Sequence, residues 1–113
     1  METYENYTLS VIVVQVDAGP LFFPSKGNAR ITEVHESAAQ HGGVPLRRKT
    51  YKSIIVGLPE SREGVKLIVA RGVAALNAIS ASPRTDLVYP DPESYINGEG
   101  LAKGMRVITG FIV

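Results

Sequence analysis

The feature that most constrains the fold is a tract at residues 54–90, where two apolar runs, a helix-like run and a proline-bounded loop follow each other without a gap. The two apolar runs, 54–56 and 65–69, are short, rich in β-branched residues and flanked by glycine or proline, which is typical of buried strands. Residues 71–80 place aliphatic side chains at helical spacing, and Pro83 closes that run. The tract therefore predicts two strands and one short helix.

Four further runs have strand-like sequences and are separated by turn residues. They are residues 9–16, 21–23, 29–34 and 107–113. Gly42 and Gly43 predict a turn before residues 44–46. Together these patterns predict an α+β fold that is mainly β. We expect a small antiparallel sandwich or barrel of about five to seven short strands, with one helix near residues 71–80.

Length and composition limit the kind of protein this can be. At 113 residues the chain has the size of one domain, so we expect residues 1–113 to form a single domain that buries about two thirds of its unfolded surface. Hydrophobic residues make up 44% and charged residues 20%, which is too apolar for a disordered chain. The sequence has no cysteine, which excludes disulfides, thiolate zinc sites and cysteine nucleophiles.

The charge balance argues against nucleic acid as a partner. Lysine and arginine number 12 against 11 acidic residues, whereas a duplex-DNA binder shows a basic excess. The basic run at 47–49, followed by Tyr51, permits a nucleic-acid contact. A solvated edge strand that is protected against aggregation explains the run better, because the whole chain is nearly neutral.

The first residues and the longest apolar run bear on location. Residues 1–6 are polar and acidic, where a signal peptide would be basic and then apolar. The longest uninterrupted apolar runs, residues 11–14 among them, are far shorter than the roughly 18 residues that suggest a membrane span. We therefore expect a cytoplasmic protein without a membrane contact.

Several short tracts follow each other in an order that resembles small proteins encoded by phages and prophages. The tracts are Pro24-Ser25-Lys26-Gly27, Ala29-Arg30, Gly43-Val44-Pro45-Leu46, Gly57-Leu58-Pro59, Ile68-Val69-Ala70 and Arg84-Thr85-Asp86-Leu87-Val88-Tyr89-Pro90. They span most of the chain. The resemblance implies a viral origin, with the host cytoplasm as the location, and it implies no known activity.

Arg84 and Asp86 form the first candidate site, because they lie two residues apart in a proline-bounded loop after the predicted helix. An arginine fork can hold a phosphate or carboxylate, and an aspartate can orient the ligand. An internal ion pair that closes the loop explains the same two residues, and we favour that interpretation. Arg71 lies at a strand-to-helix junction, where backbone N–H groups often face anions.

His35 and His41, with Glu33 and Glu36 nearby, are the candidates for metal ligands. Their six-residue separation across a loop matches no ordinary metal-binding spacing, so we interpret both as surface histidines. No Gly-x-Ser-x-Gly elbow surrounds any serine. We therefore expect no metal, no cofactor and no catalytic residue.

These observations favour a non-enzymatic phage or prophage protein that self-associates and acts by binding. We predict that it sequesters a small anionic host molecule, such as a nucleotide signal of antiviral defence, in a pocket between subunits. The ligand-binding residues would be Arg84, Asp86, Arg71, Arg47 and Tyr89. One alternative is a virion or assembly protein that pairs with copies of itself through exposed strands, including residues 47–52 and 107–113. A second alternative is an enzyme that acts on a nucleotide.

Overall fold

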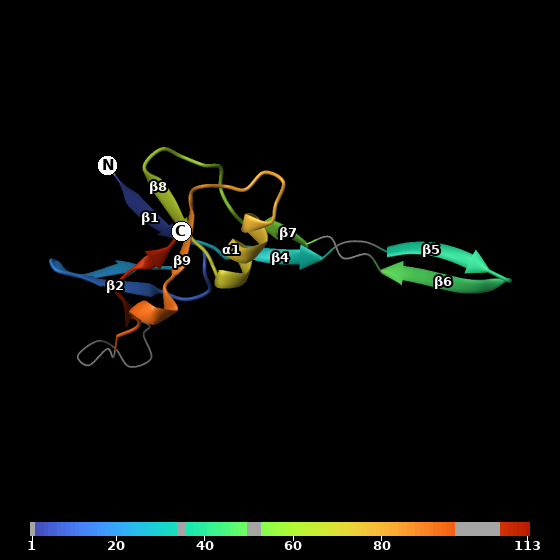
Figure 1. The fold of residues 1–113 in the computed structure, drawn as a ribbon, viewed down its shortest axis with the longest axis horizontal. Helices are drawn as coiled ribbons and strands as arrows, with labels where there is room; N and C mark the ends of the chain where they lie inside the picture. Colours follow the sequence, from blue (N-terminus) through green and yellow to red (C-terminus); the bar gives the residue numbers. More distant parts are fainter. Residues whose placement is uncertain (1, 34–35, 50–52, 97–106) are drawn as a thin grey trace.

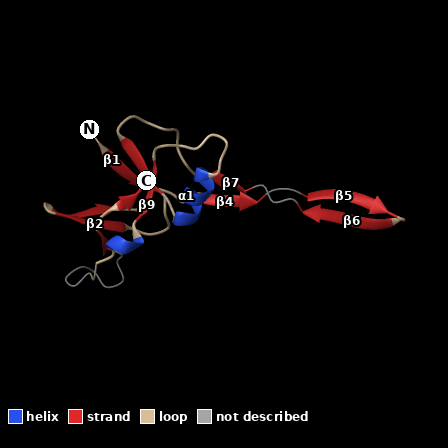
Figure 2. Ribbon diagram, in the orientation of Figure 1, coloured by secondary structure: helices blue, strands red, loops and turns tan. Residues whose placement is uncertain are grey.

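The computed structural model describes residues 2–33, 36–49, 53–96 and 107–113, and it is mainly β (Figures 1 and 2). The described strands are β1 (Thr3–Asn6), β2 (Ile12–Val16), β3 (Gly19–Phe23), β4 (Arg30–Glu33), β5 (Glu36–His41), β6 (Val44–Lys49), β7 (Ser53–Val56), β8 (Val65–Ile68), β9 (Leu87–Pro90), β10 (Val107–Ile108) and β11 (Phe111–Ile112). One α-helix, α1 (Arg71–Ala78), and one 3-10 helix, η1 (Pro92–Ser94), complete the described elements. The predicted β-rich α+β class and the helix near 71–80 are confirmed.

The central sheet has the order β1-β8-β9-β11, and its first three strands are parallel. The antiparallel arrangement expected from the sequence is therefore wrong for this sheet. The reason is that α1 connects β8 to β9 as a crossover, which returns the chain to the same end of the sheet before the next strand begins. Leu87–Pro90, which the sequence placed in a loop, is the third of these strands.

A second sheet, with the order β10-β2-β3, shares a hydrophobic cluster with the central sheet. The buried members of this cluster are Ile12, Val14, Ile68, Val88 and Ile108, with Phe23 and Phe111 packed against them. On the other face of the central sheet, α1 buries Val73 against Leu67 and Val69 of the β8 segment. The second half of β8 is therefore covered on both faces, with Ile68 in the first cluster and Leu67 in the second, whereas Lys66 is exposed. None of the described sheets closes into a barrel.

Several strand boundaries differ from the sequence prediction. The run at 107–113 is divided at Thr109 and Gly110, so that β10 pairs with β2 and β11 pairs with β9. The run at 9–16 becomes strand only from Ile12, because the preceding residues form a hydrogen-bonded loop. The sequence did not predict β1 or β5. Both are short strands whose polar residues give little alternation.

The hairpin of β5 and β6 projects from the rest of the molecule, and we call it the arm (Figure 1). We call all the other described elements together the body. Gly42 and Gly43 have φ angles of 57° and 75°, which form the predicted turn as a two-residue type I′ turn. The molecule is 69 Å long, and its radius of gyration is 18.8 Å. A compact domain of this length has a radius of gyration of about 13 Å.

Candidate functional site

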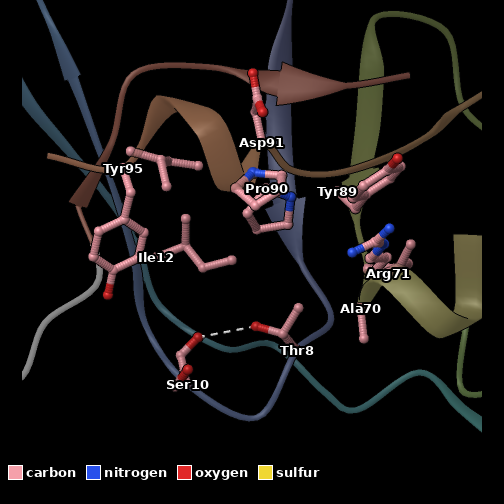
Figure 3. Close-up of a pocket in the computed structure, with 12 residues that line it drawn as sticks. Thr8, Ser10, Ile12, Ala70, Arg71, Tyr89, Pro90, Asp91 and Tyr95 are labelled. Atoms are coloured by element: carbon pink, nitrogen blue, oxygen red, sulfur yellow. Dashed lines mark hydrogen bonds between the residues drawn. The ribbon is translucent and has the colours of Figure 1, made fainter.

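A cavity of about 370 Å³ lies where the carboxyl ends of the three parallel strands meet (Figure 3). We call it the cleft. It is lined by Thr8, Ser10, Ile12, Val69, Ala70, Arg71, Tyr89, Pro90, Asp91, Pro92, Tyr95 and Ile108. Ligands of open sheets with parallel strands bind outside the carboxyl ends of those strands. The position of the cleft in the fold is therefore typical of a binding site.

The loop after β1 forms one wall of the cleft, and Asn6 fixes this loop. The Asn6 side chain is completely buried. Its Nδ2 donates to the carbonyl oxygens of Ser10 and Phe23, at 2.8 Å each. Its Oδ1 accepts from the backbone N–H and the hydroxyl of Thr8, at 2.9 and 2.6 Å. Because both the donor and acceptor capacity of the amide is used, Asn6 holds Thr8 and Ser10 in place along the cleft.

The start of α1 forms a second wall and carries the positive end of the helix. The N-cap residue, Ala70, offers no side-chain hydrogen bond, and the first turn has no acidic residue. The first N–H groups of a helix have no partner within it, so this end can receive an anion. Arg71, the first residue of α1, is exposed and lines the cleft. Gly72 lies in the first turn, and a Cβ added there would meet no other atom within 4 Å.

Aromatic and aliphatic groups form the remaining walls. Tyr89 lies beside Arg71 on one side of the cleft, and Tyr95 lies on the opposite side (Figure 3). The Asp91 carboxylate accepts a 2.9 Å hydrogen bond from the Glu93 N–H and so caps η1. In Figure 3 this carboxylate points away from Thr8 and Ser10. The cleft is thus largely apolar, with Arg71 as the cation at its edge.

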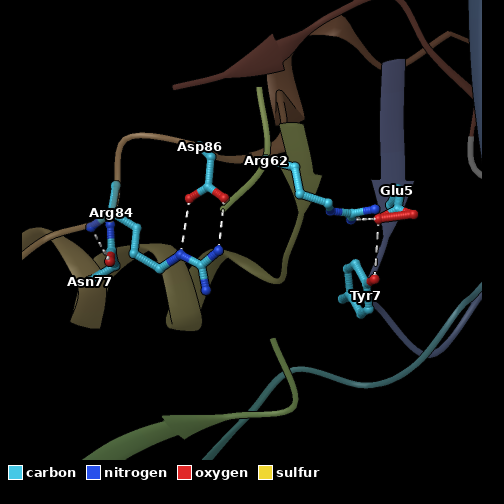
Figure 4. Close-up of polar contacts among 6 residues, drawn as sticks. All are labelled: Glu5, Tyr7, Arg62, Asn77, Arg84 and Asp86. Atoms are coloured by element: carbon cyan, nitrogen blue, oxygen red, sulfur yellow. Dashed lines mark hydrogen bonds and ion pairs between the residues drawn. The ribbon is translucent and has the colours of Figure 1, made fainter. Parts of the chain in front are cut away.

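Arg84 and Asp86 form an internal ion pair, the interpretation favoured from the sequence (Figure 4). Arg84 Nε donates to Oδ1 at 3.0 Å and Nη2 donates to Oδ2 at 2.8 Å. Asn77 on α1 clamps the backbone of Arg84, because its Nδ2 donates to the Arg84 carbonyl oxygen and its Oδ1 accepts from the Arg84 N–H, both at 2.9 Å. This geometry closes the loop between α1 and β9.

The environment of Asp86 sets its protonation. Burial acts to raise the pKa of this carboxyl, but the hydrogen bonds and positive charge of Arg84, together with hydrogen bonds from the Asp86 backbone and from Ser61, lower the pKa below its ordinary value. Asp86 is therefore held in its charged form by a partner in the same chain. The Nε and Nη2 groups of Arg84 both donate to this one carboxylate.

The structure separates the five residues that the sequence nominated for ligand binding. Arg71 and Tyr89 both line the cleft, whereas Arg84 and Asp86 pair with each other in the loop between α1 and β9. Arg47 lies on β6 in the arm, which projects away from the body (Figure 1). The five nominated residues, all within the described part of the chain, therefore lie in three separate locations.

The sequence did not indicate Thr8, Ser10, Asp91 or Tyr95 as site residues. The one local pattern that could have indicated part of the loop is Asn6-Tyr7-Thr8, because an asparagine at a strand end often forms a side-chain turn with the second following residue. His35, Tyr51 and Lys52 lie outside the described residues. His41 is exposed at the tip of the arm.

A second buried carboxylate, Glu5, joins three segments of the body (Figure 4). Lys26 Nζ donates to it at 2.8 Å and the Tyr7 hydroxyl donates at 3.3 Å. Arg62 donates to the same carboxylate. Each of these partners comes from the same chain, so we assign Glu5 to the stability of the body and not to the cleft.

The described part of the chain contains no group of three or more histidine, aspartate or glutamate side chains placed to hold a metal ion. It also contains no helix of the length and apolarity that crossing a membrane requires. Comparisons with protein-family models, with curated proteins and with solved structures give no match to this chain.

Proposed function

We propose that this protein is a non-enzymatic binding protein that holds a small anionic, nucleotide-like ligand in the cleft. One observation carries the proposal: Arg71, the uncapped start of α1 and two tyrosines line one concavity at the carboxyl ends of three parallel strands. In this proposal the two sheets that share a hydrophobic cluster act as an open sandwich, which keeps the walls of the cleft rigid.

The chemistry of the walls matches the parts of such a ligand. A phosphate would lie at the Arg71 guanidinium and the first N–H groups of α1. A planar base would pack on Tyr95 and the neighbouring aliphatic groups of Ile12 and Ile108. Asn6 holds the loop of Thr8 and Ser10 in place. The Thr8 hydroxyl donates its proton to Asn6 and can accept a hydrogen bond from ribose, while the Ser10 hydroxyl can donate one. The cavity volume of about 370 Å³ falls within the range of small-ligand sites.

Sequestration requires only that phosphate and base are buried together, and these groups supply both contacts. Given the resemblance to phage and prophage proteins, we propose that the ligand is a nucleotide signal of host defence. Because Arg84 and Asp86 are already paired with each other, we place the ligand in the cleft and leave these two residues outside it.

The test is calorimetric titration of the purified chain with a panel of adenine nucleotides, with adenosine as the phosphate-free control. Arg71→Ala should weaken nucleotide binding at least tenfold, about the free energy of one charge-assisted hydrogen bond. Arg30→Ala is the matched control, because Arg30 is also exposed but lies on β4, outside the cleft. Equal loss of affinity in both variants, or adenosine binding as tightly as the nucleotides, would contradict the proposal.

The assembly alternative is favoured by a different observation, the exposure of the arm. Every described side chain from 38 to 47 is exposed, including Val44 and Leu46. Self-association and ligand binding are compatible here, because the arm and the cleft involve different residues.

A further inference from the structure

We propose that the outer edge of β5 is a docking edge for a second copy of this chain. In the proposed dimer, two β5 strands pair antiparallel. The two arms then form one four-stranded sheet with the order β6-β5-β5-β6. This inference does not rest on the ligand-binding proposal.

The first argument is the stability of the arm. β5 pairs with β6 and with no other described strand, so the arm is a two-stranded sheet. An isolated hairpin of this kind is marginally stable in water, and three or more strands with a covered face are needed for independent stability. Val44 is 59% exposed and Leu46 is 50% exposed, so these aliphatic side chains gain little from folding within one chain.

The second argument is the difference between the two edges of the arm. Along an antiparallel ladder, hydrogen-bonded residue pairs alternate with non-hydrogen-bonded pairs. In a hairpin with a two-residue turn, the pair that flanks the turn is hydrogen-bonded, and here that pair is His41 with Val44. The next pair, Gln40 with Pro45, therefore directs its backbone groups outward. Proline has no N–H, so Pro45 interrupts the outer edge of β6. The run Arg47-Arg48-Lys49 adds positive charge to the same strand, which is how natural proteins block an edge.

The outer edge of β5 has neither of these obstacles. By the same alternation, the N–H groups of Ala38 and Gln40 face outward and are available to another strand. Ala38 and its neighbour Ala39 both have small side chains, so a second backbone can approach closely. The sequence had suggested the basic segment at 47–52 as a pairing strand. The register instead points to β5.

The alternation limits the pairing register, because outward-facing residues must pair with outward-facing residues. Of the registers that this allows, we propose the one that places Ala38 of one copy opposite Gln40 of the other. The two-fold axis then passes between the two Ala39 residues, which form a close, non-hydrogen-bonded pair. Because Leu46 lies opposite Ala39 within each arm, this register produces an apolar row of Leu46, Ala39, Ala39 and Leu46 across the four strands.

Charge and shape both agree with this dimer. The two β6 strands become the outer strands, three strand spacings or about 14 Å apart. That separation exceeds the screening length of about 8 Å at physiological salt, so repulsion between the two basic runs is weak. Because the arms are antiparallel and project from the bodies, the two bodies lie at opposite ends of the new sheet (Figure 1).

The first test uses proline to block one edge at a time. Ala38 and Arg47 lie opposite each other in one pair whose N–H groups face outward, so a proline at either position removes an edge donor and spares the ladder of the arm. Sedimentation equilibrium should give twice the chain mass of 12.2 kDa for the unaltered protein and for Arg47→Pro, and a single chain mass for Ala38→Pro. A monomeric unaltered protein, or a dimeric Ala38→Pro variant, would overturn the proposal.

The second test decides the case in which both prolines disrupt the arm. The chain has no cysteine, so Ala39→Cys introduces a single thiol at the two-fold axis. The Cα separation of a non-hydrogen-bonded pair, about 4.5 Å, is within the range of a disulfide. Mild oxidation should convert Ala39→Cys into a covalent dimer. Val44→Cys, an exposed thiol on β6 of the same arm, should remain a single chain. Failure of Ala39→Cys to cross-link, or equal cross-linking of both variants, would overturn the β5 register.

Discussion

The body and the arm use the same backbone pattern and differ in what covers it. In the body, alternate residues of the strands reach a core in which Val13, Val69 and Val107 have no exposed surface. In the arm the register is equally regular over six residue pairs, but every described side chain from 38 to 47 is exposed. Since burial of apolar surface is the main source of folding free energy, a regular ladder is not sufficient for stability. The comparison suggests that the body is stable by itself and that the arm requires a partner.

The sharpest way to test this comparison is the same truncation in both regions. Leu67 on β8 is 1% exposed, and Leu46 on β6 is 50% exposed. Leu67→Ala should lower the free energy of unfolding by about 2–5 kcal/mol, because it removes packed methyl groups and leaves a cavity. Leu46→Ala should change it by about 0.5 kcal/mol or less in the single chain. Urea denaturation at low protein concentration measures both values. Equal losses would mean that the arm is packed as the body is.

The polar interior of the body provides a second test, with a smaller effect. Asn6→Asp keeps the shape of the side chain but removes the donors to the carbonyl oxygens of Ser10 and Phe23. It also places a charge where the side chain has no exposed surface, so we expect a loss of about 2–3 kcal/mol in the free energy of unfolding.

The matched control for Asn6→Asp is Asn77→Asp. Asn77 is only partly buried, and its amide donates one hydrogen bond, to the Arg84 carbonyl oxygen. We expect a loss of about 1 kcal/mol there. Urea denaturation of both variants provides the comparison. A larger loss at Asn77 than at Asn6 would contradict the role given to Asn6 in holding the loop of the cleft.

The sequence predicted local features of both regions better than it predicted their pairing. The helix starting at Arg71, the strand near residues 65–69 and the turn at Gly42 and Gly43 follow from spacing and turn chemistry, and each is confirmed. The direction of a strand relative to its neighbours depends on which segments meet in space. The hydrophobic periodicity of the sequence carries no information about that direction. The parallel order of β1, β8 and β9 was therefore missed.

Only the part of the candidate site that depends on neighbouring residues in the sequence was predicted. Arg71 was nominated because a strand-to-helix junction is visible in sequence, and the Arg84 and Asp86 pair because the two residues are close neighbours. The role of Asn6 depends on a hydrogen bond to Phe23, which is 17 residues away. Such a contact exists only once β1 and β3 are in place, so no local pattern could show it.

The smallest effect that we predict concerns the Arg84 and Asp86 pair and its dependence on pH. The pKa of Asp86 is lowered in the folded chain, so between the folded pKa and the unfolded value of about 3.9 the unfolded chain binds more protons. The contribution of the pair to stability is therefore fully present above about pH 5 and is lost as pH falls through the folded pKa.

Asp86→Asn removes this titration. Urea denaturation over a range of pH should show a constant difference in unfolding free energy between the two proteins near neutral pH, and a shrinking difference below about pH 4. Because the pair belongs to the body, Asp86→Asn should leave both nucleotide binding and the sedimentation mass unchanged at neutral pH. A difference that grows toward acid would contradict the lowered pKa of Asp86 in the folded chain. A loss of nucleotide binding in a variant that remains folded would return Arg84 and Asp86 to the list of ligand-binding residues.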